Sequence, residues 1–169
     1  MSYHQDLLEQ ARLLAEMESG KPRQASLRRA VSAAYYALFH FLVDQACRQM
    51  FGTAHRSRLL RQAVARAFDH RAMKGASKAF ATGQLPLGLR GRAAVPSPLR
   101  EIAEAFVLLQ EQPHQADYNL ARPFRREEVA ILVDKADACV RRLWPQVAQQ
   151  DGSRLYLAAL LLWEKLKSR

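Results

Sequence analysis

Residues 27–42, LRRAVSAAYYALFHFL, carry polar side chains at helical spacing without a glycine or proline. At 100° per residue, Arg29, Tyr36 and His40 fall within about 40° of one another, and Ser32 lies near the edge of the same stripe. An imidazole beside hydroxyl groups and a guanidinium could transfer a proton or contact a nucleotide. Since the other faces are apolar or small, we expect a central helix whose polar stripe enters the interior. Such buried polar groups need partners.

A second polar cluster, Asp117 and Tyr118, follows His114. Asp117 would cap a turn or pair with an arginine such as Arg29, and Tyr118 would bury its ring with its hydroxyl satisfied. His40 is interpreted as a neutral core histidine, because the sequence shows no carboxylate partner for it. We therefore expect these residues to form a structural polar network that holds two helices in register.

Two arginine–histidine pairs have spacings that suggest RNA cleavage. Arg66 and His70 are at i and i+4, where the arginine would stabilise a phosphorane and the histidine would move a proton. Arg48 and His55 form the other pair, but their interval crosses the expected end of a helix. The i, i+4 spacing places two residues on one face, which is common by chance in an arginine-rich chain. Catalysis is therefore the weaker interpretation.

The net charge of +10 is concentrated in the middle of the chain. Residues 51–100 contain 10 Lys and Arg and a single acid, Asp69, whereas residues 1–50 have a net charge of +1 and residues 101–169 a net charge of 0. A localised positive field attracts polyanions more than a diffuse one does. An incidental preference for arginine is the alternative, but it does not explain the near absence of acids. The candidate nucleic-acid-binding residues are Arg58, Arg61, Arg66, Arg71 and Lys74.

Several function classes are disfavoured. The sequence has no Walker loop, dinucleotide fingerprint, HExxH, zinc-ligand spacing or nucleophile elbow, so we expect no cofactor and no metal. Cys47 and Cys139 are interpreted as buried, reduced thiols. The N-terminus shows no secretory signal, and the longest apolar run, residues 155–163, is too short to span a membrane. We expect a cytoplasmic protein without a membrane segment.

The elements that must position these residues are helices, because the alternation typical of strands is absent. We expect a single domain over residues 1–169, an all-α up-and-down bundle of five or six helices. Residues 74–97, which hold four of the seven glycines, are interpreted as a loop. The expected helices cover residues 4–18, 22–50, 54–72, 97–112, 125–144 and 151–168.

Two of these helices have faces that call for partners. The third has an apolar side, expected to be buried, formed by Leu59, Leu60, Ala63, Val64, Ala67 and Phe68. The last, residues 151–168, is apolar over much of its circumference. It needs a groove on its own domain or on a second copy of the chain.

Two segments together resemble the HEPN-domain superfamily. Residues 27–42 are similar to its R-x-A-Y-Y-A-x-F-H helix, and residues 114–140, HQADYNLARPFRREEVAILVDKADACV, are similar to the ADY segment of its noncatalytic-looking branch. The resemblance covers most of residues 22–145. It implies an up-and-down helical bundle, a homodimer, and a role in toxin–antitoxin or RNA-related defence systems, often beside a small nucleotidyltransferase.

Many members of that superfamily are metal-independent ribonucleases with an arginine and a histidine a short interval apart. At the corresponding positions this chain has Pro113 and Tyr118. The resemblance therefore implies a noncatalytic module that binds RNA or a protein partner through its basic segment. The alternatives are a metal-independent endoribonuclease that uses one of the two arginine–histidine pairs, and a structural or regulatory subunit with no nucleic-acid role.

Overall fold

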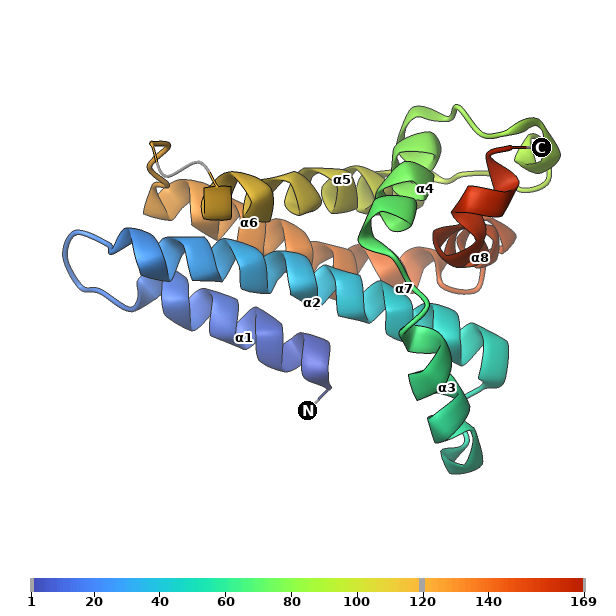
Figure 1. The fold of residues 1–169 in the computed structure, drawn as a ribbon, viewed down its shortest axis with the longest axis horizontal. Helices are drawn as coiled ribbons and strands as arrows, with labels where there is room; N and C mark the ends of the chain where they lie inside the picture. Colours follow the sequence, from blue (N-terminus) through green and yellow to red (C-terminus); the bar gives the residue numbers. More distant parts are fainter. Residues whose placement is uncertain (1, 119–120, 169) are drawn as a thin grey trace. The chain divides into compact units, whose positions relative to one another are not determined.

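The structure is a computed structural model that describes the backbone of residues 2–118 and 121–168, and the side chains of residues 2–113 and 121–168. No strand occurs in these ranges, which confirms the all-α fold class (Figure 1). None of the helices described is both long and apolar enough to cross a membrane. In chain order the elements are α1 (Tyr3–Glu16), α2 (Gln24–Phe51), a 3-10 turn η1 (His55–Ser57), α3 (Arg58–Ala65), α4 (His70–Thr82), a 3-10 turn η2 (Leu87–Leu89), α5 (Ser97–Tyr118), α6 (Arg126–Ala138), a π-helical turn η3 (Cys139–Leu143), α7 (Trp144–Val147) and α8 (Asp151–Leu166).

The chain divides into two compact units. Unit 1 comprises Met1–His40 and Ala105–Arg142, and unit 2 comprises Phe41–Glu104 and Leu143–Arg169. The unit boundaries fall within α2, α5 and η3, so each of these helices contributes residues to both units. Both cysteines, Cys47 and Cys139, are buried and form no disulfide, as the sequence predicts.

Unit 1 is an up-and-down arrangement of α1, the first part of α2, the second part of α5, and α6 (Figure 1). Arg12 of α1 forms an ion pair with Asp137 of α6 at 3.1 Å. The rings of Tyr35 and Phe106 lie 5.8 Å apart and join α2 to α5. The predicted apolar stripe of α2 is confirmed, because Tyr35, Leu38 and Phe39 are all buried.

The predicted burial of the polar stripe of α2 is wrong. Arg29 is exposed, Tyr36 is 42% exposed, and Ser32 and His40 are half-buried. Alanine and leucine side chains of α2 occupy the interior instead, so the polar stripe faces the surface. The His40 ring meets the Tyr3 ring edge-on, with 4.8 Å between their centroids. His40 therefore lies beside the start of α1 at the margin of the core.

Unit 2 is organised around the pairing of α4 with α8. The hydroxyls of Ser77 and Tyr156 are hydrogen-bonded at 2.8 Å in the interior, and the rings of Phe80 and Tyr156 lie 5.0 Å apart. The apolar C-terminal helix thus finds its groove on its own chain. Trp163 of α8 lies against Gly75 of α4 so closely that a Cβ on the glycine would collide with the indole.

The expectation that residues 74–97 form a loop is wrong for its first part, since α4 continues to Thr82. Asp69 starts this helix by accepting a hydrogen bond from the Ala72 backbone N–H at 2.9 Å, and Gly83 ends it with φ = +72°. Gly75 lies inside the helix, at a close contact that only a glycine allows. From the sequence alone, such a glycine cannot be distinguished from one that signals a loop.

Other helix ends also differ from the prediction. The expected helix over residues 54–72 is interrupted, because α3 ends at Ala65 and α4 begins at His70. Pro113 lies inside α5, so the expected end at residue 112 is wrong. A proline removes a single backbone donor, and here the helix continues through it. Pro145 occupies the first turn of α7, where its missing N–H costs little.

Candidate nucleic-acid interface

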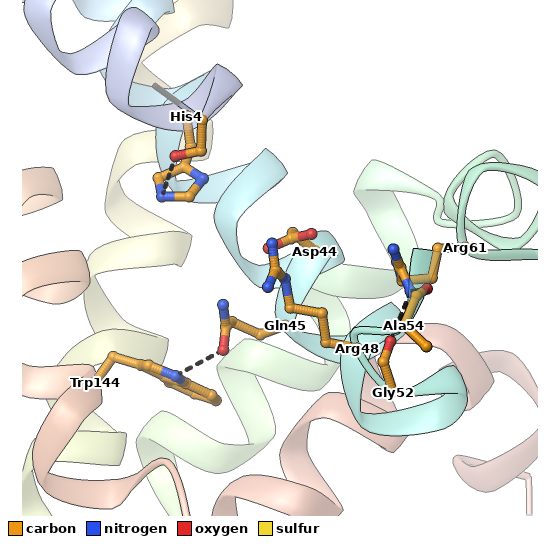
Figure 2. A network of polar contacts seen from close by, with 9 residues as sticks. His4, Asp44, Gln45, Arg48, Gly52, Ala54, Arg61 and Trp144 are labelled. Atoms are coloured by element: carbon orange, nitrogen blue, oxygen red, sulfur yellow. Dashed lines mark hydrogen bonds and ion pairs between the residues drawn. The ribbon is translucent and has the colours of Figure 1, made fainter. Parts of the chain in front are cut away.

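The basic segment of unit 2 begins at the end of α2 and continues through α3. None of the residues of α3 is buried. The Arg61 Nη1 donates to the backbone carbonyls of Gly52 at 2.7 Å and Ala54 at 3.1 Å (Figure 2). These two hydrogen bonds of the Nη1 nitrogen therefore connect the turn after α2 to α3. This part of the predicted nucleic-acid set has a structural function.

Four other arginines of the segment project from the surface without a partner. The side chains of Arg56, Arg58, Arg66 and Arg71 are exposed, and in the part of the chain with described side chains none of them makes an ion pair or hydrogen bond. No acid occurs between Gln45 and Phe68. Each guanidinium keeps its five N–H donors available to solvent or to an anion. Lys74, the remaining candidate, is half-buried.

The proposed pairing of Arg66 with His70 on one helix face is wrong. Arg66 is the C-terminal cap of α3, and His70 is the first residue of α4 behind its N-cap, Asp69. Burial lowers the pKa of the His70 imidazole, while the Asp69 carboxylate partly opposes that shift. The His70 imidazole is therefore harder to protonate than an ordinary histidine.

The second candidate pair is also divided between elements. The Arg48 Nε donates to the Asp44 carboxylate at 2.6 Å within α2 (Figure 2), and His55 begins η1 after the chain has turned. The charge of Arg48 is therefore compensated by an acid one turn earlier. A guanidinium engaged in this way is a poorer stabiliser of a developing phosphorane charge.

The remaining sequence candidates do not add a site. The side chains of Asp117 and Tyr118 lie outside the described residues, and the four α2 residues of the predicted network lie at the surface of unit 1. Among the described side chains, no group of three or more His, Cys, Asp or Glu residues is placed to hold a metal ion.

One feature of the basic segment was missed at the level of sequence. Leu59 and Leu60 were expected in the core, but they are 76% and 55% exposed. Their spacing does indicate an amphipathic helix, and α3 is one. Periodicity did not reveal that Leu59 and Leu60, on the apolar side of α3, face outward.

These features define an all-helical protein, over the residues described, with four exposed arginines and two exposed leucines in the segment 56–71. No family model matches the chain, and no curated protein or solved structure matches it either. The HEPN resemblance of residues 27–42 and 114–140 accordingly stays a prediction.

Proposed function

We propose that the chain is a noncatalytic helical binding module of HEPN type that binds RNA through Arg56, Arg58, Arg66 and Arg71. The observation that carries this proposal is that these four exposed guanidinium groups have no acidic partner among the described side chains. Guanidinium groups bind phosphate oxygens in a bidentate manner, and a phosphodiester chain offers such oxygens at regular intervals. Toxin–antitoxin or RNA-related defence systems are the setting that the resemblance implies.

Several arginines outside the proposed interface pair with acids. In unit 1, Arg12, Arg122 and Arg141 each form an ion pair with an acid. In unit 2, Arg48 pairs with Asp44. These four arginines are matched by nearby carboxylates, whereas among the described side chains the four arginines of the proposed interface are not. Uncompensated positive charge costs self-repulsion, and a polyanionic partner would relieve it.

The test is a titration of labelled single-stranded RNA at several salt concentrations. Each phosphate contact contributes about −0.7 to the slope of log affinity against log salt. In Arg56→Gln/Arg58→Gln/Arg66→Gln, loss of three contacts should reduce that slope by about 2 and weaken binding at low salt. The matched control Arg125→Gln/Lys135→Gln/Lys165→Gln removes three exposed charges elsewhere and should bind as the unaltered chain does.

Either of two results would refute RNA binding through this surface. The first is no salt-sensitive RNA affinity for the unaltered protein at 50 mM salt. The second is an equal loss in the interface variant and in the control, which would mean that total charge decides binding.

Absence of nuclease activity is the second part of the proposal. The position of the family motif holds Pro113, and the two alternative arginine–histidine pairs are divided between elements. We expect no cleavage of labelled RNA in the presence of a chelator. Cleavage that disappears in His70→Ala or His55→Ala would instead establish the endoribonuclease alternative.

A protein partner is a second candidate function, favoured by the exposure of Leu59 and Leu60. An amphipathic helix with leucines between arginines suits an acidic, apolar groove. The small nucleotidyltransferase that the resemblance implies is the partner we propose. Leu59→Ser/Leu60→Ser should abolish binding of that purified protein in calorimetry and leave RNA affinity unchanged. A parallel loss of RNA affinity would assign the leucines to the RNA surface.

We also propose a homodimer, on the strength of the resemblance. Two copies of α3 would bring unpaired guanidinium groups together, so we expect the dimer contact on a different face. Light scattering at tens of micromolar protein should give twice the chain mass of 19.2 kDa. A monomeric mass at that concentration would refute the dimer.

A further inference from the structure

We infer that unit 1 contains a binding site for a free acidic amino acid, between the turn that joins α1 to α2 and the start of α6. A cavity of about 390 Å³ lies there, within the usual range of small-molecule pockets. Both of its walls belong to unit 1 and lie at the same end of that unit (Figure 1). The site does not rest on the proposed RNA function.

Hydrogen bonds tie the two walls of the cavity together. The Gln24 Nε2 donates to the Phe124 carbonyl at 2.9 Å, and the Gln24 Oε1 accepts from the Phe124 N–H at 2.8 Å. The Arg126 Nη2 donates to the Gly20 carbonyl at 2.9 Å and also to the carbonyl of Glu18. The cavity is therefore preorganised, and a ligand does not have to order these two segments as it binds.

The lining carries free charges of both signs. Lys21, Arg125 and Glu127 all line the cavity and are exposed. Among the described side chains, none of the three makes an ion pair or a side-chain hydrogen bond. Residues two positions apart on a helix do not face each other, which explains why Arg125 and Glu127 do not pair. The lining thus offers two free cations and one free carboxylate.

An acidic amino acid matches these three charges. Its two carboxylates would bind Lys21 and Arg125, and its ammonium group would bind Glu127. Arg126 adds to the positive field, because its guanidinium donates to backbone carbonyls and makes no ion pair with a described residue. A simple anion would leave Glu127 unpaired, and an amino acid with an apolar side chain would leave one cation unpaired. A ligand with two carboxylates and one ammonium group pairs every free charge.

Calorimetry on the intact chain tests the site with L-glutamate, L-aspartate, glutarate and L-glutamine. Glutarate lacks the ammonium group, and glutamine lacks one carboxylate. We therefore expect at least one of the two acidic amino acids to bind more tightly than either analogue. The tighter of the two is the ligand that fits the cavity better.

Substitutions in the lining separate the roles of its charges. Glu127→Gln should weaken glutamate binding about tenfold, the effect of one charged contact, and should not weaken glutarate binding. Arg125→Gln should weaken the binding of both about tenfold. The matched controls are Asp134→Asn and Lys135→Gln, which change exposed residues of α6 outside the lining and should bind glutamate normally. If a lining variant does not fold, the order of affinities on the unaltered chain decides.

A further probe distinguishes the free amino acid from a glutamate within a peptide. N-acetyl-L-glutamate α-amide keeps the side-chain carboxylate but lacks the free ammonium and α-carboxylate groups. We expect it to bind more weakly than L-glutamate, and equal binding would overturn the inference. No binding of either acidic amino acid at millimolar concentration would also overturn it, as would glutarate binding as tight as that of glutamate.

RNA binding and amino-acid binding can fail independently. Arg56→Gln/Arg58→Gln/Arg66→Gln should retain glutamate binding even where it loses RNA. Arg125→Gln should retain RNA binding even where it loses glutamate. The RNA titration contains no amino acid, so the change at Arg125 in its control variant does not affect the surface tested there.

Discussion

The two cysteines show how burial controls reactivity at the scale of one residue. Cys47 and Cys139 are both buried, and neither forms a disulfide. Burial raises the pKa of the Cys47 thiol, and the Asp44 carboxylate adds to that shift. The thiolate is the reactive form, so a buried thiol with a raised pKa is inert.

We therefore predict that neither thiol reacts with a thiol-specific aromatic disulfide reagent at pH 7.5 in the native protein. Both should react within the mixing time in denaturant, and absorbance of the released thiolate measures the number that react. The matched variant Cys47→Ser leaves a single reactive thiol after unfolding. Rapid reaction of the native chain would contradict the burial of these residues.

His70 provides a pH-dependent prediction. Burial lowers its folded-state pKa below the ordinary value, so the unfolded state binds more protons in the interval between the two values. The contribution of His70 to the free energy of unfolding is therefore present above about pH 6.5 and is lost as the pH falls. Urea unfolding at pH 7.5 and 5.5 should show a larger acid-induced loss for the unaltered chain than for His70→Gln. Identical pH dependence in the two proteins would contradict it.

At the scale of elements, α4 and α8 depend on two glycines for different reasons. A Cβ at Gly75 would collide with atoms of the Trp163 side chain and with no backbone atom among its nearest neighbours. A Cβ at Gly152 would collide with the backbone carbonyl of Ala94, which is held by its chain neighbours. At Gly88, nothing lies within contact distance of an added Cβ.

We predict that Gly152→Ala destabilises the protein by about 1–3 kcal/mol, the usual cost of overpacking. Gly75→Ala should cost less, because the indole can shift and alanine favours a helix. Gly88→Ala, the matched control, should leave the free energy of unfolding within about 0.5 kcal/mol. Urea unfolding followed by circular dichroism measures all three, and an equal effect of Gly152→Ala and Gly88→Ala would contradict the close contact.

At the scale of the whole molecule, the placement of the charge matters more than its total. The net charge is +10, and the excess is nearly confined to residues 51–100. Replacement of three cations by glutamine reduces the charge by the same amount wherever the cations lie. Only replacement of arginines in the segment between Gln45 and Phe68, which contains no acid, removes the local field.

We therefore predict different heparin-column behaviour for two variants of equal net charge. Arg56→Gln/Arg58→Gln/Arg66→Gln should elute at clearly lower salt than Arg125→Gln/Lys135→Gln/Lys165→Gln, because heparin is a polyanion that meets the local field. The measurement is the salt concentration at the elution peak. Elution of both variants at the same salt would mean that the charge acts as a diffuse total.

Much of the fold was predictable because helical signals are local. Ser97 and Pro98 indicated the start of α5, and the glycine after Thr82 ends α4. The apolar stripe of α2 was also predictable. The candidate site was predictable only in part. The lack of acids can be read from the sequence, but the partners of each arginine depend on the tertiary structure.

The sequence by itself determined that the chain is helical, which residues share a helix face, and where positive charge gathers. Only the tertiary structure decided which face is inside, because periodicity is defined around a helix's own axis and burial depends on what packs against it. For this reason the Arg29–His40 stripe and Leu59 lie at the surface. In the same way, the sequence did not show why a glycine stands at position 75 inside a helix. Without a side chain, Gly75 leaves room for the indole of Trp163, which lies far along the chain.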